Sequence, residues 1–373
     1  MILLFLSSGL FLGWSLGAND AANIFGSAVG TKMVKFRTAA IIATIFVILG
    51  AVIQGAGATH TLGKLGQVNA LAGSFTVALA AAITVAVMTK YRLPVSTSQA
   101  IVGAIIGWNL YTGNETDSAS LTKIVSTWIF APILGGFFAV ILYQIQKKII
   151  ETSKIHLIKL DHFLRMGLLV VGAFGAYSLG ANNIANVMGV FIQAAPVENF
   201  VIGPFSFTGI QQLFFLGSLA IGVGIITYSR KIMSTVGNKL FALSTEAALV
   251  VVLAHSLVLF VFSSQGLSNA VQSIGLPAIP LVPVSSSQAI VGAILGIGIL
   301  KGAKEIKLNV MGGIAVGWIT TPIAAGVITF FSLFFMQHVF RLEVENTETK
   351  IELSTNEMQS LKQENNLIIN NNN

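Results

Sequence analysis

Long apolar runs separated by short polar breaks dominate the pattern of this chain. A helix needs about 20 apolar residues to cross roughly 30 Å of hydrocarbon. Ten runs approach or exceed that length, five before and five after a charged stretch in mid-chain. They are 2–30, 38–58, 69–89, 94–111, 121–146, 163–192, 207–228, 241–262, 281–300 and 308–338. The pattern predicts an all-α polytopic membrane protein with ten membrane segments.

Three motifs of the first half recur in the same order in the second half, which indicates an internal repeat. The paired segments are 17–26 with 180–189, 94–107 with 283–296, and 128–133 with 318–323. The second pair is identical at 12 of 14 positions. The spacing between the first two motifs is about 26 residues longer in the second half. We expect much of this insertion to lie in the uncharged, turn-rich segment 266–282.

Each half contains an odd number of segments, so the second half must enter the membrane from the opposite face. The halves are therefore predicted to be inverted repeats. We divide the chain into a first repeat (1–146), a cytoplasmic linker (147–162), a second, inverted repeat (163–340) and a polar extracytoplasmic tail (341–373). The tail is rich in Glu and Asn, and we expect it to be solvated.

Composition supports the prediction of a membrane protein, and the distribution of basic residues adds a prediction of its orientation. The chain is 54% hydrophobic and 9% charged with a mean hydropathy of +0.82, which excludes an ordinary soluble fold. Cytoplasmic loops are enriched in Lys and Arg, and alternate loops carry 16 of the 21 basic residues. The net charge of +7 therefore reports orientation and not a nucleic-acid partner. We predict a multi-pass protein of the cell (plasma) membrane with both termini extracytoplasmic.

The first motif places Asn19, Asp20 and Asn23 inside an apolar segment. A carboxylate there costs at least about 2.5 kcal/mol on insertion scales, so Asp20 needs a proton or a bound cation. The amides and the carboxylate supply hard oxygen ligands, which suit Na⁺ better than a transition metal. Helix-packing hydrogen bonds are the alternative role. The copy carries Asn182, Asn183 and Asn186, so one carboxylate serves both halves.

The second motif, Ser96-Thr97-Ser98-Gln99, follows Pro94 and recurs as Ser285-Ser286-Ser287-Gln288. Proline breaks the preceding segment, and Ser with Gln three residues later predicts a capping box that opens a helix. A helix start offers free N–H groups and a positive dipole end to an anion. Inversion would bring the two starts face to face around a tetrahedral oxyanion. Alternatively, the serines only satisfy buried helix ends.

Other residues receive less specific assignments. We expect Gly103 and Gly292 to make close helix contacts within G-x-x-x-G spacings. His255, unpaired in the sequence, is assigned to packing, as are Gln54, His60 and Glu246. The four tryptophans are expected to anchor or pack. No nucleophile and base lie at a recognisable spacing, so we do not expect an enzyme. No cysteine is present, which excludes disulfides and thiolate metal sites.

Inverted repeats with interrupted segments are typical of secondary transporters. At the quoted motifs the chain resembles the inorganic phosphate transporter (PiT) family, sodium-coupled type, in both halves. The resemblance implies phosphate uptake coupled to Na⁺ or H⁺, a homodimer, and broken helices or re-entrant hairpins that raise the segment count toward twelve. Asn183 departs from the signature, since many members carry Asp there. This leaves the number of coupled cations open.

The resemblance and the motifs together assign the site residues. For phosphate they are Asn23, Ser96, Thr97, Ser98, Gln99, Asn186, Ser285, Ser286, Ser287 and Gln288. For sodium they are Asn19, Asp20, Asn23, Asn182, Asn183 and Asn186. We predict phosphate import by Na⁺ symport through alternating access, in membrane lipid, with Na⁺ as coupling ion and without a cofactor. An H⁺-coupled phosphate permease, a sulfate permease and an anion channel are the alternatives.

Overall fold

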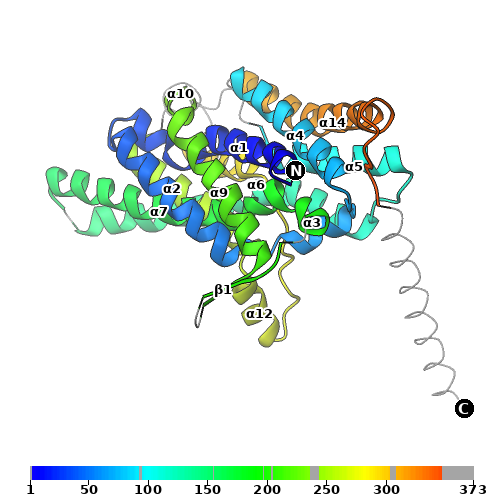
Figure 1. Cartoon of the computed structure of the whole chain (residues 1–373). Helices are drawn as coiled ribbons and strands as arrows, with labels where there is room; N and C mark the ends of the chain where they lie inside the picture. Colours follow the sequence, from blue (N-terminus) through cyan, green and yellow to red (C-terminus); the bar gives the residue numbers. More distant parts are fainter. Residues whose placement is uncertain are drawn as a thin grey trace, which may run out of the picture.

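The structure, a computed structural model, is built almost wholly from helices (Figure 1). It describes residues 2–91, 95–153, 155–195, 197–202, 205–235, 243–302 and 308–346. The helices are α1 (Ile2–Gly30), α2 (Phe36–Gln54), α3 (Thr59–Leu65), α4 (Leu71–Lys90), α5 (Thr97–Thr112), α6 (Ser118–Ser153), α7 (Leu157–Met188), α8 (Phe191–Ala194), α9 (Gly209–Thr227), α10 (Ser229–Thr235), α11 (Thr245–Val261), α12 (Gln265–Ser273), α13 (Ser286–Leu300) and α14 (Leu308–His338). Two short strands, β1 (Phe200–Ile202) and β2 (Phe205–Phe207), pair antiparallel.

The predicted all-α polytopic architecture is confirmed. Within the described ranges, seven helices are long and apolar enough to cross a membrane, namely α1, α2, α4, α6, α7, α9 and α14. The pair α11 and α12, bent by 72°, makes an eighth candidate. Eight of the ten predicted segments correspond to these candidates. The other two correspond to the shorter helices α5 and α13.

Helices α5 and α13 are too short to cross the hydrocarbon by themselves. They contain 16 and 15 residues, which gives lengths of about 24 and 22 Å at 1.5 Å per residue, against roughly 30 Å of hydrocarbon. Both begin at the repeated serine motif, after residues in extended conformation. At least one end of each helix must therefore lie below the membrane surface. Pro94, predicted to break the preceding segment, lies outside the described residues.

The two halves pack against each other in matching pairs. Helix α1 packs on α9 as α7 packs on α2, and α5 packs on α14 as α13 packs on α6. Gly103 lies against the backbone of Pro322, and its repeat equivalent Gly292 lies against that of Pro132. A Cβ at either glycine would overlap that backbone. The predicted close helix contacts are thus present, and each joins one half of the chain to the other.

The additional length of the second half lies in two connections. The α7–α9 connection contains α8 and the β1–β2 hairpin, whereas α1 and α2 are joined by residues 31–35 only. The α11–α13 connection contains α12, as predicted for the segment 266–282. In Figure 1 the hairpin and α12 project from one side of the molecule, and α10 lies on the opposite side. The prediction located only the second of these insertions.

The charged linker predicted at 147–162 is mostly helical. Helix α6 continues to Ser153 and α7 begins at Leu157, with His156 as its N-cap. Exposed i, i+4 ion pairs lie on both helix ends, Lys147 with Glu151 at 3.8 Å and Asp161 with Arg165 at 3.5 Å. At 36 and 32 residues, α6 and α7 are about 54 and 48 Å long, so both extend well beyond the hydrocarbon.

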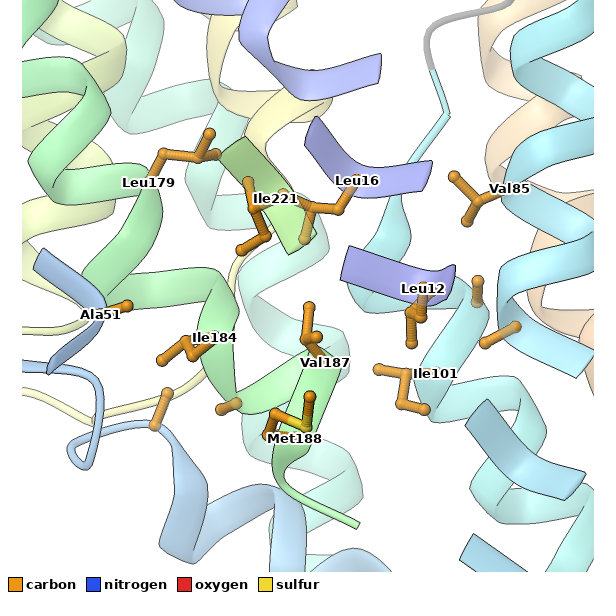
Figure 2. Close-up of a cluster of buried hydrophobic side chains, with 14 of the residues drawn as sticks. Leu12, Leu16, Ala51, Val85, Ile101, Leu179, Ile184, Val187, Met188 and Ile221 are labelled. Carbon is orange, nitrogen blue, oxygen red and sulfur yellow. The ribbon is translucent and has the colours of Figure 1, made fainter. Parts of the chain in front are cut away.

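The core lies between the two halves, and large exposed apolar side chains form rows on several outer helices, among them α6 and α14. Figure 2 shows side chains from α1, α2, α4, α5, α7 and α9 in one buried cluster, including Leu16 of α1 and Ile221 of α9. By contrast, Ile133 of α6 is 59% exposed and its repeat equivalent Ile323 of α14 is 62% exposed. Contiguous rows of exposed apolar side chains mark an interaction surface, and on helices long enough to span a membrane that surface fits lipid.

The start of the tail is packed, which corrects the expectation of a solvated segment. Val344 is buried, and its carbonyl accepts a hydrogen bond from Trp108 Nε1 at 3.0 Å. Asn69 pairs with the backbone of Asn346 through two bonds of 2.9 Å. Residues 341–346 therefore cover the end of α5 and the start of α4. Residues beyond 346 lie outside the described part of the chain.

Candidate functional site

Every predicted site residue is buried in the structure. All fourteen have an exposed fraction of 3% or less and come from α1, α7 and the starts of α5 and α13. They are Asn19, Asp20, Asn23, Ser96, Thr97, Ser98, Gln99, Asn182, Asn183, Asn186, Ser285, Ser286, Ser287 and Gln288. Burial of so many polar groups is costly unless they bind one another or a ligand.

The first group of buried polar residues, here called the α1 cluster, consists of Asn19, Asp20 and Asn23 with Ser286 and Thr89. Asn19 Nδ2 donates to Thr89 Oγ1 at 2.8 Å. Asn23 Nδ2 donates to Ser286 Oγ at 3.0 Å. The signature helix of the first half thus contacts the helix start of the second half.

The second group, the α7 cluster, consists of Asn182, Asn183 and Asn186 with Ser98 and Val284. Asn186 Nδ2 donates to Ser98 Oγ at 2.8 Å and to Asn183 Oδ1 at 2.9 Å. Ser98 Oγ lies 3.3 Å from Asn183 Oδ1. Asn182 Oδ1 accepts from the Val284 backbone N–H at 2.9 Å. The signature helix of the second half thus contacts the helix start of the first half.

The two helix starts meet directly. Ser98 Oγ, in the first turn of α5, donates to the carbonyl of Val284 at 3.0 Å. Val284 is followed by Ser285, the N-cap of α13. Since Ser286 belongs to the α1 cluster, residues 284–286 connect both clusters into one polar region. The predicted juxtaposition of the two starts is therefore present in the structure.

The capping prediction is correct for serine and wrong for glutamine. Ser96 Oγ accepts from the Gln99 backbone N–H, and Ser285 Oγ accepts from that of Gln288, both at 3.2 Å. Neither glutamine Oε1 has a hydrogen-bond partner among the described residues. Thr208 of α9 shows the contrast, because its capping box is complete. The buried carboxamides of α5 and α13 are thus not used by the caps.

Several other buried polar atoms of the region have no protein partner in the described ranges. These atoms are Asp20 Oδ1, Thr97 Oγ1, Asn183 Nδ2, Asn186 Oδ1 and His255 Nδ1. Unpartnered buried polar groups in a native fold call for an explanation such as a bound ion or ligand. The donors could bind an oxyanion, whereas the carboxylate and amide oxygens could bind a hard cation. No group of three or more His, Cys, Asp or Glu side chains able to hold a metal occurs in the described part.

Sequence reasoning missed Thr89 of the α1 cluster and also His255, which contacts a member of that cluster. His255 of α11 had been assigned to packing, yet its Nε2 lies 2.9 Å from Ser286 Oγ. Thr89, near the end of α4, had not been singled out. A histidine inside an otherwise apolar helix was the available signal for His255. The neighbouring Lys90 and the ordinary composition of α4 gave no such signal for Thr89.

A cavity near the polar region opens beside α3. About 300 Å³ in volume, it is lined by α3, α8 and the residues that directly follow α7, and includes His60, Lys64 and Gly189. Gly189 ends the repeated motif that begins at Gly180. The cavity therefore lies one to two helical turns from the asparagines of α7.

The comparisons with known proteins agree with one another. Residues 16–329 and 278–371 match the phosphate transporter family. A candidate phosphate permease of Pyrococcus furiosus is 26% identical over 403 aligned residues, covering 88% of this chain and 94% of that protein. One of Methanocaldococcus jannaschii is 28% identical, covering 86% and 93%.

The fold also matches a solved structure. A sodium-dependent phosphate transporter superposes with a TM-score of 0.69 at 20% identity, covering 90% of this chain and 98% of that one. At this identity the match is evidence for the fold alone. With the family match extending over most of the sequence, the chain belongs to the phosphate transporter family.

Proposed function

We propose that this protein imports inorganic phosphate by Na⁺ symport through alternating access. One observation carries the proposal. Two buried helix starts meet in a polar region that includes Asp20, the one buried carboxylate of the described residues, and several buried polar atoms of this region have no partner among those residues. Membership of the phosphate transporter family and the likeness to a sodium-dependent phosphate transporter support the substrate.

The anion would be held by hydroxyls, amides and backbone N–H groups. Ser96 to Gln99 and Ser285 to Gln288 would contribute their side chains and the first N–H groups of α5 and α13. These N–H groups carry the positive end of the helix dipole, which favours negative charge. Asn23 and Asn186 would position the serines, since each already donates to one of them.

Cations would neutralise the charge that phosphate brings. Unit charges at 4 Å interact by several kcal/mol even at an effective dielectric of 20, so phosphate and Asp20 repel unless cations bind between them. Na⁺ would bind at Asp20 with Asn19 and Asn23, and Asn182, Asn183 and Asn186 would contribute amide oxygens. The membrane potential would drive any surplus positive charge inward by about 2.3 kcal/mol per charge per 100 mV.

The test is uptake of labelled phosphate by vesicles containing the purified protein, with Na⁺ replaced by K⁺ at constant pH. We expect accumulation against the gradient in Na⁺ only. Asp20→Asn should abolish Na⁺-driven accumulation, whereas Asp161→Asn, which changes an exposed aspartate of α7, should leave it intact. Accumulation by Asp20→Asn vesicles would refute the coupling assignment.

The same assay separates the alternatives. Accumulation in K⁺ that follows the pH gradient would indicate H⁺ coupling, with Asp20 as a proton acceptor. Competition by sulfate at equal concentration would indicate a sulfate permease. Conductance without accumulation would indicate an anion channel. The homodimer, the cell-membrane location and the outward termini remain predictions from the resemblance and the basic residues.

A further inference from the structure

The segment 281–284, which precedes α13, reaches from a cavity to the buried polar region. Leu281 lines this second cavity of about 450 Å³ together with residues of α3, the end of α2 and the start of α12. Val284, three residues farther on, contacts Ser98 of the proposed phosphate site. An extended chain advances at most about 3.6 Å per residue. No more than about 11 Å of backbone therefore connects the cavity wall to the site.

Hydrogen bonds from other parts of the chain hold the inner end of the segment. Asn182 Nδ2 donates to the Val282 carbonyl at 3.1 Å, and its Oδ1 accepts from the Val284 N–H at 2.9 Å. One carboxamide thus pairs with two backbone groups, as a neighbouring strand would. The Val282 N–H also donates to the Phe262 carbonyl at 3.2 Å. Asn182 Oδ1 keeps one lone pair for a cation, so the proposed Na⁺ site and the segment share this residue.

At the cavity end, a threonine of α3 holds the segment. Thr61 Oγ1 donates to the Leu281 carbonyl at 2.8 Å. Both residues are only partly buried, and both line the second cavity. The Leu281 side chain also lies beside Gly57, 3.5 Å from the position that a Cβ would take there. The two ends thus differ, because the inner end is buried and bonded several times, whereas the outer end is held at a wall that water reaches.

The helix before the segment is loosely packed and can move with it. Helix α12 projects from one side of the molecule (Figure 1), and Ser268 is the one buried residue among its nine. Ser268 Oγ donates to the Ile279 carbonyl at 3.0 Å, which ties α12 to the approach of the segment. Parts of a fold with few buried contacts open at low free energy. Movement of α12 would therefore pull on the segment at Leu281.

We propose that segment 281–284 is the outer gate of the anion site, with Thr61 as its latch and Asn182 as its inner anchor. The gate is closed in this structure, since Leu281 is bonded to α3. Release of the latch lets phosphate pass from the second cavity to the two helix starts. The gate lies on the face of α3 and α12, which is predicted to be extracytoplasmic. The proposal rests on the phosphate import proposed above and gives Thr61 a role in admitting phosphate, not in binding it.

The first experiment measures how readily a reagent from the water reaches the inner end of the gate. Val284→Cys is made in the cysteine-free chain, and a small, membrane-impermeant, anionic methanethiosulfonate is added outside intact cells. Thr61→Val keeps the shape of the latch but removes its hydroxyl. We expect it to speed modification of Val284→Cys by about two- to tenfold, the range that corresponds to one typical hydrogen bond. Equal rates with and without Thr61→Val would overturn the proposal.

The matched control is Thr59→Val on the same helix. Thr59 Oγ1 donates to the Gly55 carbonyl at 3.2 Å, within its own turn of the chain. This variant loses a hydrogen bond of the same kind but leaves the segment untouched. Modification of Val284→Cys should therefore keep the rate that it has without Thr59→Val. An equal acceleration by both threonine variants would assign the effect to α3 as a whole and contradict the latch.

The second experiment locks the gate. Thr61→Cys and Leu281→Cys are combined and joined by a short, reducible bifunctional thiol reagent, and mass spectrometry measures the fraction joined. Uptake of labelled phosphate should stop on joining and return on reduction, whereas each single variant should be unaffected by the reagent. Continued uptake by fully joined protein, or failure of the two residues to join, would refute the gate. If the unchanged protein accumulates no phosphate, the proposed function fails, while the rates at Val284→Cys still test the gate.

Discussion

At the scale of single residues, the three polar positions of the two signature motifs differ once, and hydrogen bonding in the structure does not require the difference. Asn183 replaces the carboxylate found at Asp20. Its Oδ1 accepts from Asn186 Nδ2 and lies within bonding distance of Ser98 Oγ, while its Nδ2 has no partner in the described part. A carboxylate could accept both bonds. The asparagine therefore leaves the α7 cluster with one negative charge fewer than it would have with an aspartate at this position.

Asn183→Asp should fold and should increase the need for cations. The aspartate keeps both accepted bonds but adds a buried charge, which needs a further cation or proton. We expect steeper dependence of phosphate uptake on Na⁺ concentration, measured as the Hill coefficient. Asn182→Asp is the contrast, because Asn182 Nδ2 donates to the Val282 carbonyl, and its loss should cost about 1–3 kcal/mol of stability. Unchanged Na⁺ dependence in Asn183→Asp would separate this residue from the cation site.

Ser98 and Ser287 are equivalent in sequence, but their alanine variants should differ. Ser98 Oγ contacts Asn183, Asn186 and the Val284 carbonyl, whereas Ser287 Oγ contacts Ser285. Both replacements should weaken phosphate binding in a direct binding assay. Ser98→Ala should also lower the free energy of unfolding by about 1–3 kcal/mol, and Ser287→Ala should lower it less. Unchanged phosphate affinity in both variants would move the anion site elsewhere.

At the scale of elements, sequence patterns located most helices and both helix starts, but not their partners. Ser96 and Ser285 are the N-caps that the motif predicted, since capping depends on local sequence. His255 joins the site through the packing of α11 on α1 and α13, a non-local arrangement that no spacing encodes. The packed tail was missed for the same reason, because Val344 stands between two glutamates and its contact with Trp108 arises only in three dimensions.

The close packing of α13 on α6 can be tested by enlarging the glycine at their contact. Gly292→Val would place a branched side chain against the backbone of Pro132. Overpacking of this kind costs about 1–3 kcal/mol, so we expect lower thermal stability and weaker phosphate uptake, because α13 begins at the site. Gly313→Ala in α14 is the control, since nothing lies within 4 Å of its added Cβ. Equal stability of the two variants would show that α13 can move away from α6.

At the scale of the whole molecule, cysteine labelling can measure the orientation of the chain in the membrane without prior removal of native cysteines. The protein contains no cysteine, so each introduced cysteine reports its own position. Gly266→Cys, at the start of α12, should react with a membrane-impermeant thiol reagent added outside intact cells. Lys231→Cys in α10 should react only after the cells are permeabilised. Both positions are exposed, so labelling of Lys231→Cys from outside would reverse the predicted topology.

The exchange of contacts between the two halves has a consequence for ancestry. The asparagines of α1 need the helix start of α13, and those of α7 need that of α5. A half-length ancestor would therefore have carried each cluster incomplete. Two copies of it could have completed both clusters only by exchanging these contacts, and with the predicted inversion they would have had to insert in opposite orientations. Joining two copies in one gene would then have allowed each half to change separately, as the one aspartate in the two signature motifs illustrates.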